Sequence, residues 1–294
     1  MTEFTLDALN DMIPAEFAAA LGDVCEHSPW VALAAASKRP FATVAALHEG
    51  LMSVIAERPE AEQLAFLRAH PELAGLQARA GTMTADSIAE QASLGLANLP
   101  RTDTDRFAEL NAAYGKRFGF PFIICVRHHT RDAILQRFEQ RLQRDAATEK
   151  SAALAEIANI TRLRLVAKVS GAGMPKTEGR LSTHVLDTVS GRPAPGVRIE
   201  LTQIGPRGDG LIVSTVTNAD GRTDAPLIAG TPLRVGTYEL QFHIGDHFRR
   251  VGTAAADPAF LDVVPIRFQI AEPTGHYHVP LLASPWSYTT YRGS

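Results

Sequence analysis

The spacing of hydrophobic residues changes once along the chain, near residue 168. Before that point, apolar side chains recur three and four positions apart, as they do on one face of a helix. Examples are Phe17, Leu21 and Val24, then Leu47, Leu51 and Val54, and then Ile134, Phe138 and Leu142. Prolines divide this part into segments of helix length, and alanine, which favours helices, is frequent. The first 168 residues are therefore predicted to form an all-α bundle.

After about residue 180 the spacing becomes two, which is typical of strands with one buried face. Apolar and polar residues alternate in 197–202, 238–244 and 266–270. Turn signals rich in Gly, Asp and Asn separate these runs. Several short strands bounded by turns predict a β-sandwich.

Length and composition agree with two domains in one soluble chain. A chain of 294 residues is longer than one hydrophobic core usually serves. We assign 1–168 to a helical domain, the weakly patterned, Gly-rich segment 169–179 to a linker, and 180–294 to a β domain. The net charge of -3 gives no support for a nucleic-acid partner or an anionic membrane.

The cysteines and the N-terminus indicate the compartment. Cys25 and Cys125 are the only cysteines, too few for a disulfide framework, and a reducing cytosol is the simplest setting. The first residues are acidic and lack the basic and apolar regions of a signal peptide. No apolar stretch approaches the roughly 20 residues of a membrane span. We expect a cytoplasmic protein without a membrane partner.

A pair of histidines in the β half is candidate chemistry. His276 and His278 are two residues apart, so they point to the same face of an extended strand. Such a pair is typical of a metal site or an acid–base site, although for the pair alone polar decoration of a solvated face is the simpler interpretation. This half has no cysteine and no HExxH spacing, which argues against zinc without excluding it.

Four segments together favour the acid–base interpretation. They are LSTHVLD at 181–187, NADGR at 218–222, HYHVPLL at 276–282 and YRGS at 291–294. In this order they resemble the 5-hydroxyisourate hydrolase family, which shares its fold with the hormone carrier transthyretin. The resemblance covers about residues 180–294.

The resemblance implies a set of site residues and a reaction. The implied catalytic residues are His184, Arg222 and His278, and those implied at the substrate site are Tyr291, Ser294 and, with a less certain role, His276. Opening a cyclic acylurea requires water activated by a base, which a neutral histidine supplies near pH 7. A fixed arginine can stabilise the charge that develops on the attacked carbonyl oxygen. A transthyretin-type carrier would not need these groups, so we favour an enzyme.

Three segments of the helical half carry a second signal. They are AHPELAG at 69–75, SIAEQ at 87–91 and FGFPFIICV at 118–126. Each has a simpler interpretation. His70 precedes a proline and should lie at a helix end, where it can interact with the helix C-terminus. The second segment could be an ordinary solvated helix face, and the third could be core.

Taken together with SPW at 28–30 and RPF at 39–41, these segments resemble 2-oxo-4-hydroxy-4-carboxy-5-ureidoimidazoline (OHCU) decarboxylase over about residues 5–166. The resemblance implies that His70 and Glu90 are catalytic residues, with His70 as the proton donor. A carboxylate such as Glu90 can hold the ureido N–H groups of the substrate. The implied substrate pocket comprises Pro71, Ser87, Gln91, Phe122, Ile123, Ile124, Cys125, Val126 and Arg164. One departure is His128-His129, where relatives often carry a glycine.

The two implied activities are consecutive. Hydrolysis of 5-hydroxyisourate gives OHCU, and decarboxylation of OHCU gives (S)-allantoin. The ring itself can accept the electrons left by carbon dioxide, so we expect no cofactor and no metal. The families imply a homo-oligomer, either a dimer or a tetramer, with the hydrolase site at a subunit interface. Two alternatives remain: an inactive carrier or scaffold, and a zinc-dependent cyclic amidohydrolase, which elemental analysis would distinguish.

Overall fold

The computed structural model describes residues 3–74, 84–93, 95, 100–205, 210–253 and 257–293. The chain divides into two compact units, and each is described by itself. The first contains residues 1–127 and 133–177, and the second contains 128–132 and 178–294. The first unit is helical and the second is built from β-sheets, which confirms the predicted fold class. Within the described ranges, no helix is both long enough and apolar enough to cross a membrane.

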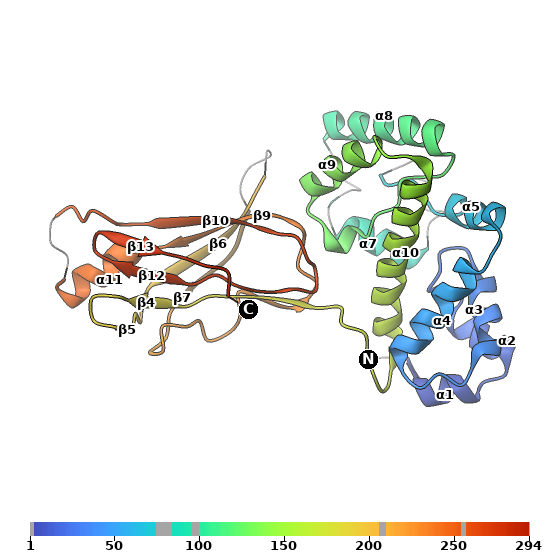
Figure 1. Ribbon diagram of the computed structural model, residues 1–294, viewed down its shortest axis with the longest axis horizontal. Coiled ribbons are helices and arrows are strands. Elements are labelled where there is room, and N and C mark those ends of the chain that lie inside the picture. Colours follow the sequence, from blue (N-terminus) through green and yellow to red (C-terminus); the bar gives the residue numbers. More distant parts are fainter. Residues whose placement is uncertain are drawn as a thin grey trace. The chain divides into compact units, whose positions relative to one another are not determined.

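Helices make up most of the described part of the first unit (Figure 1). They are α1 (Leu6–Asp11), α2 (Pro14–Leu21), α3 (Pro29–Ala35), α4 (Val44–Ala56), α5 (Glu60–Arg68), α7 (Ala85–Ala92), α8 (Arg101–Phe118), α9 (Arg131–Arg141) and α10 (Ala146–Lys168). The described residues also form the short 3-10 segments η1 (Ala36–Lys38) and η3 (Val126–His128). Prolines open α2 and α3 at the first helical position, where a missing N–H costs nothing. Side chains of Thr5, Thr43, Thr84 and Asp145 cap α1, α4, α7 and α10.

The predicted apolar faces of the helices are buried in one core. Phe17 and Leu21 of α2 and Leu47 and Leu51 of α4 are at most 1% exposed. The long helix α10 packs against α4 and extends through the unit toward α8 and α9 (Figure 1). The sequence pattern therefore identified the buried side of these helices correctly.

Residues just after α10 belong to the helical unit, although the sequence suggested a linker there. Strand β2 (Val169–Ser170) pairs in parallel with β1 (Phe4–Thr5). The next carbonyls, of Ala172 and Gly173, accept hydrogen bonds from the first N–H groups of α4. Gly173 has φ +59°, and a Cβ there would lie 2.6 Å from the Thr43 side chain. The glycine that suggested flexibility is needed for this close approach.

A cluster of aromatic rings fixes the segment around residue 122. Phe122 stacks on Phe138 with ring centroids 3.8 Å apart, and the Tyr114 ring meets both edge-on. The Arg141 guanidinium lies over the Phe122 ring and donates a hydrogen bond to the carbonyl of Ile123 at 2.8 Å. The predicted FGFPF segment is therefore core, and it also presents its backbone to a pocket described below.

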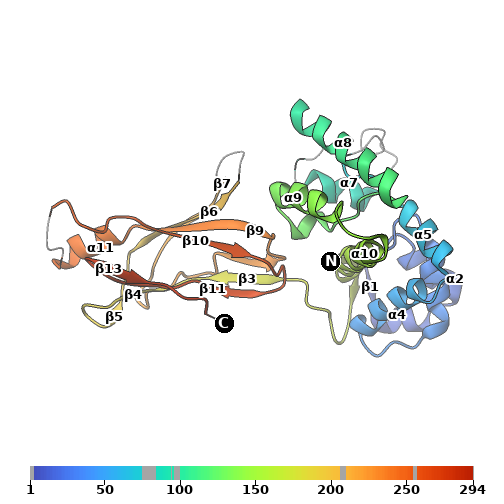
Figure 2. The ribbon, with the colours of Figure 1, turned by 45° about the horizontal axis from the view of Figure 1, so that its top comes forward.

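The described strands of the second unit form three sheets (Figure 2). One is an antiparallel sheet in the order β10 (Val264–Ile270), β9 (Gly236–Phe242), β6 (Arg198–Ile204) and β7 (Gly210–Val216). The second has β11 (His276–His278), β3 (Gly179–Ser182) and β8 (Ile228–Thr231), and the third has β13 (Ser287–Thr289), β12 (Leu281–Ser284), β4 (Val185–Asp187) and β5 (Arg192–Pro193). Strand β11 runs parallel to β3, and β12 runs parallel to β4.

The core of the β unit lies between the antiparallel sheet and the other two sheets. Leu201 and Leu240 contribute from the antiparallel sheet, and Leu181 and Leu281 contribute from the others. The predicted alternation was wrong at one end, because Ile244 does not continue strand β9. It begins helix α11 (Ile244–Val251), whose inward face buries Ile244 together with Phe248. Ile244 lies two positions after Phe242 and is buried, so its spacing matched the strand pattern although it belongs to a helix.

The buried carboxylate of Glu149 is central to the helical core, and we expect Glu149→Ala to destabilise this unit. Glu149 is fully buried and accepts hydrogen bonds from the Tyr114 hydroxyl and from Nε of Arg141, the latter at 2.7 Å. Removing it leaves the Arg141 charge buried without its partner, which costs about 3–5 kcal/mol. Chemical denaturation followed by helical circular dichroism measures this loss. A change below about 1 kcal/mol would show that the cluster tolerates an unpaired arginine.

Candidate active sites

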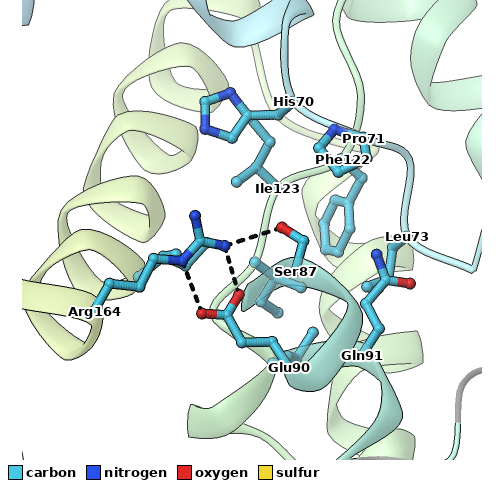
Figure 3. A pocket seen from close by; sticks show the side chains of 12 residues that line it. His70, Pro71, Leu73, Ser87, Glu90, Gln91, Phe122, Ile123 and Arg164 are labelled. Carbon is cyan, nitrogen blue, oxygen red and sulfur yellow. Dashed lines mark hydrogen bonds and ion pairs between the residues drawn. The ribbon is translucent and has the colours of Figure 1, made fainter. Parts of the chain in front are cut away.

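The helical unit contains a pocket that collects most of the residues predicted there. Its empty volume is about 440 Å³, part of it open to solvent. The lining residues are His70, Pro71, Leu73, Ser87, Glu90, Gln91, Phe122, Ile123, Ile124, Val126, Ile160 and Arg164 (Figure 3). Three separate segments of the sequence and two residues of α10 therefore meet at one cavity.

Local structure explains how each segment reaches the pocket. Helix α5 ends at Arg68, so His70 lies just past a helix end, as its position before proline predicted. Helix α7 carries Ser87, Glu90 and Gln91 on one face, as their spacing predicted. The three side chains point into the same space in Figure 3.

Arg164 of α10 is the charged centre of this pocket. Its Nε and Nη2 donate to the two carboxylate oxygens of Glu90 at 2.9 and 2.8 Å, which is a bidentate pair (Figure 3). Nη2 also donates to the hydroxyl of Ser87 at 2.9 Å. Although burial acts to lower it, the pKa of Arg164 is raised above its usual value by these carboxylate contacts. The guanidinium is a permanent cation at the pocket wall.

Glu26 is a second carboxylate partner of Arg164 that the sequence analysis did not identify. Its Oε2 accepts from Nη1 of Arg164 at 2.9 Å, and its side chain is 1% exposed. Glu26 precedes the SPW segment by two residues, but a single glutamate beside polar neighbours carries no signal of burial. Only the packing of α10 against this segment brings the two residues together.

His70 is held in one orientation and is kept neutral. Its Nδ1 lies 3.0 Å from the carbonyl of Phe66, a geometry in which Nδ1 carries the proton and donates it. Among the described residues, none forms a hydrogen bond with Nε2. Burial lowers the pKa of His70 to about 4. At neutral pH the side chain therefore offers an unprotonated Nε2, which can accept a proton before it donates one.

The pocket differs from the predicted set in a few positions. Cys125 is not part of its lining, and its backbone N–H donates to Glu156 at 2.9 Å. Leu73 and Ile160 line the cavity but were not predicted. Both are apolar residues within helical patterns, and nothing in their sequence context separates them from core residues.

In the β unit, three predicted or neighbouring side chains form a hydrogen-bonded chain. Nδ1 of His184 and Nε2 of His278 share a hydrogen bond of 2.7 Å, and Nδ1 of His278 lies 2.9 Å from the Ser182 hydroxyl. The same hydroxyl lies 3.4 Å from Nε2 of His276. Ser182 was not predicted, although it stands within the LSTHVLD segment and two residues before His184, hence on the same strand face.

Both central histidines of this chain are biased toward the neutral form. Burial and the Arg222 guanidinium lower the pKa of His184. Burial, together with His184, Arg222 and His276, lowers the pKa of His278. Neutral histidines that share one proton are suited to act as a base and to pass a proton along the chain.

A tight turn places Arg222 beside His184. The Asn218 side chain accepts from the backbone N–H groups of Asp220 and Arg222, and Arg222 forms a β-bridge with His184. Gly221 has φ +67°, and a Cβ there would lie 2.4 Å from the carbonyl of Val185. Glycine is therefore required for the turn to approach the strand, which explains the DGR motif physically.

The C-terminal tail returns to the same histidines. The N–H of Gly293 donates to the carbonyl of His278 at 2.8 Å, which brings the YRGS segment to the site. Tyr291 in this segment is 51% exposed. Ser294, also expected at the site, lies outside the described residues. His276 lies on β11 with an exposed side chain. Within the part of the chain that the structure describes, no group of three or more His, Cys, Asp or Glu side chains is placed to hold a metal ion.

The two units thus define a two-domain enzyme with a histidine at each of its sites. Comparison with known proteins agrees. A family model described as OHCU decarboxylase matches residues 10–166, and one described as the HIUase/Transthyretin family matches residues 181–293. The chain belongs to both families and is a bifunctional enzyme of urate degradation, with a decarboxylase domain followed by a hydrolase domain.

Individual relatives cover each half, and one covers the whole chain. The 5-hydroxyisourate hydrolase 2 of Rhizobium meliloti (strain 1021) is 56% identical over 116 residues, which are 40% of this chain and 97% of that protein. The 2-oxo-4-hydroxy-4-carboxy-5-ureidoimidazoline decarboxylase of Haloferax volcanii is 39% identical over 170 residues, 58% of this chain and 99% of that protein. A crystal structure of (S)-allantoin synthase is 35% identical with a TM-score of 0.56, and the match covers 99% of this chain and 100% of that one.

The low pKa of His70 predicts the pH dependence of the decarboxylase site. If a neutral His70 starts the reaction, kcat/KM should stay constant as the pH falls through 6.5, the usual histidine value, and decrease only toward pH 4. The pKa of His70 is lowered rather than raised because burial disfavours the protonated, charged form of the ring. The profile is measured by following OHCU loss in buffers of constant ionic strength. An acid limb near pH 6.5 would contradict the buried, neutral histidine.

The Ser182 hydroxyl should set the proton position in the hydrolase site. We expect Ser182→Ala to lower kcat for 5-hydroxyisourate hydrolysis at least about tenfold, because His278 loses the partner that orients its ring and fixes its tautomer. Ser182→Thr keeps the hydroxyl and serves as the control. Initial rates are measured by the absorbance of 5-hydroxyisourate. Equal rates for the alanine and threonine variants would remove Ser182 from the proton path.

Proposed function

We propose that the β unit hydrolyses 5-hydroxyisourate to OHCU and that the helical unit decarboxylates OHCU to (S)-allantoin. The observation that carries this proposal is that one chain holds both side-chain sets: the His184–His278–Ser182 chain beside Arg222, and the His70 pocket with its Arg164–Glu90 pair. Both intermediates are unstable in water, which gives a reason to keep the two sites tethered.

In the decarboxylase site, the substrate has to separate Arg164 from Glu90. Arg164 is a planar cation with two parallel donors, which suits the substrate carboxylate, and Glu90 can then accept from the ureido N–H groups. When the bond to carbon dioxide breaks, its electron pair moves into the ring toward the imine-type group. The pocket therefore needs no further electron acceptor.

His70 then controls where the proton arrives. Its unprotonated Nε2 takes the proton of the substrate hydroxyl, since the side chain begins neutral. The same nitrogen returns this proton to the ring carbon, on the face that it lies against, and water supplies a second proton to the ring nitrogen that received the electron pair. Delivery from one face produces one enantiomer, and this positioning accounts for the (S) product.

In the hydrolase site, one arrangement of protons gives His184 the role of base. If Nδ1 of His278 donates to Ser182, Nε2 of His278 accepts from Nδ1–H of His184, and Nε2 of His184 is left unprotonated. This nitrogen can take a proton from water as the water attacks a carbonyl carbon of the cyclic acylurea. When the ring C–N bond then breaks, the leaving nitrogen takes that proton from His184. Arg222 stabilises the charge on the attacked carbonyl oxygen. His276, Tyr291 and Ser294 are proposed to contact the substrate.

A second copy of the chain is proposed to complete the hydrolase site. Trp286, Tyr288 and Tyr291, on or beside β13, are 59%, 46% and 51% exposed, and such a group of exposed aromatic rings favours a protein interface. Strand β7, at the edge of its sheet, also exposes Leu211 at 63%. A cytoplasmic location is proposed because two cysteines, both buried, are too few for the disulfide framework of a secreted protein.

Single substitutions should separate the two activities. His70→Ala should leave loss of 5-hydroxyisourate unchanged, while OHCU accumulates and decays without enzyme, so that the allantoin formed is racemic. His278→Ala should slow 5-hydroxyisourate loss about a hundredfold and leave decarboxylation of supplied OHCU intact. Absorbance of freshly generated 5-hydroxyisourate and chiral analysis of the product measure the two steps.

Each variant is the control for the other. A His70→Ala chain that still produced only the (S) enantiomer would show that the proton comes from another group. If both substitutions reduced both rates, the units would not act independently, and the proposal of two separate sites would be wrong.

A further inference from the structure

Glu26 is a buried carboxylate of the helical unit that has no part in the mechanism above. Its side chain is 1% exposed, and burying a charge costs free energy unless charged or hydrogen-bonding partners surround it. The partners of Glu26 therefore indicate what the residue does.

Groups from two helices donate to this carboxylate. Oε2 accepts from the hydroxyls of Thr84 and Ser87 at 2.7 and 2.8 Å and from Nη1 of Arg164 at 2.9 Å. Oε1 accepts from the backbone N–H of Thr84 at 3.2 Å. Burial acts to raise the pKa of Glu26, but the hydrogen bonds from Thr84 and Ser87 and the Arg164 charge outweigh it and leave the pKa lowered. Glu26 is therefore ionised at neutral pH.

These partners connect the two helices that carry the proposed substrate contacts. Thr84 caps the N-terminus of α7, and α7 presents Glu90 to the pocket. Arg164 belongs to α10. A negative charge beside the first turn of α7 is also favourable for the helix. The Glu26 carboxylate thus holds the start of α7 against Arg164.

Glu26 and Glu90 use different edges of the Arg164 guanidinium. Glu90 occupies the edge formed by Nε and Nη2, and Glu26 occupies Nη1. When Glu90 turns to the substrate, the edge it leaves has the two parallel donors that a carboxylate prefers. The contact with Glu26 does not have to break during this exchange.

We propose that Glu26 is a positioning residue of the decarboxylase site. It holds Arg164 and the first turn of α7 in place while Glu90 exchanges Arg164 for the substrate. The inference rests on the proposed decarboxylase function and adds a carboxylate that does not itself touch the substrate.

The charge of Glu26 also reaches His70, which gives a measurable signature. The groups that act on His70 are the carbonyl of Phe66 and the charges of Glu26, Arg164 and His27. Glu26 raises the pKa of His70, whereas Arg164 and His27 lower it. Loss of the Glu26 charge should therefore lower the pKa of His70 further, an effect that a purely structural residue would not produce.

The test uses the full chain with Glu26→Gln, which keeps the shape and removes the charge. We expect KM for OHCU to rise at least about tenfold with a smaller change in kcat, because Arg164 collapses onto Glu90 and becomes less available. The acid limb of kcat/KM should move to lower pH. OHCU is generated in the assay from 5-hydroxyisourate by an excess of the His70→Ala chain. Wild-type KM and an unmoved acid limb in a folded Glu26→Gln chain would overturn the proposal.

Glu26→Asp keeps the charge but shortens its reach. Glu26→Asp should raise KM for OHCU and leave the acid limb of kcat/KM in its wild-type position. This variant tests the proposal if Glu26→Gln fails to fold. An Asp variant with wild-type KM, or with a moved limb, would also overturn the proposal.

Glu149→Gln is the matched control, since it removes another buried carboxylate that pairs with an arginine in the same unit. Glu149→Gln should lower thermal stability without moving the acid limb of kcat/KM. If the limb moved as far in Glu149→Gln as in Glu26→Gln, the shift would report general damage to the unit, and the proposal would be overturned. Failure of the wild-type chain to decarboxylate would instead refute the proposed function, which separates the two cases.

Discussion

Burial of the Arg164 charge is the constraint on which the decarboxylase pocket depends. A guanidinium at 5% side-chain exposure is stable only if carboxylates surround it, and here Glu26 and Glu90 do so from two sides. Satisfying this charge fixes α7 against α10 and so places the residues that meet the substrate. The same pairing that stabilises the empty pocket has to open when a carboxylate substrate enters, so stability and binding depend on one ion pair.

In the β unit, the proposed site is built around neutral histidines rather than around a buried ion pair. His278 is hydrogen-bonded to Ser182 on one side and to His184 on the other. Burial and the nearby Arg222 lower the pKa of both histidines. Among the described residues, no buried carboxylate is hydrogen-bonded to these three side chains. These half-buried neutral rings can remain accessible to water and to a second subunit, whereas the decarboxylase pocket has to enclose its substrate to orient one carboxylate and one proton.

The rest of each unit supports these few contacts. Stacking of Phe122 on Phe138 and the hydrogen bond from Arg141 to Ile123 hold the apolar wall of the first pocket. In the second unit, the Gly221 turn and the Gly293 bridge bring two distant segments to the histidines. In the first pocket these supports belong to the hydrophobic core, and in the second unit they are backbone contacts that fix the distances the site requires.

The sequence by itself determined the helical and β halves, the buried faces of α2 and α4, the helix end at His70 and the shared face of Ser87, Glu90 and Gln91. These follow from periods of 3.6 and two and from the restrictions of proline, which act over a few residues. The tertiary structure alone decided that Glu26 meets Arg164, that Ile160 lines the pocket while the backbone N–H of Cys125 binds Glu156, and that Ile244 begins a helix. Such contacts join residues far apart in the chain, and local patterning carries no information about which buried charge will find which partner.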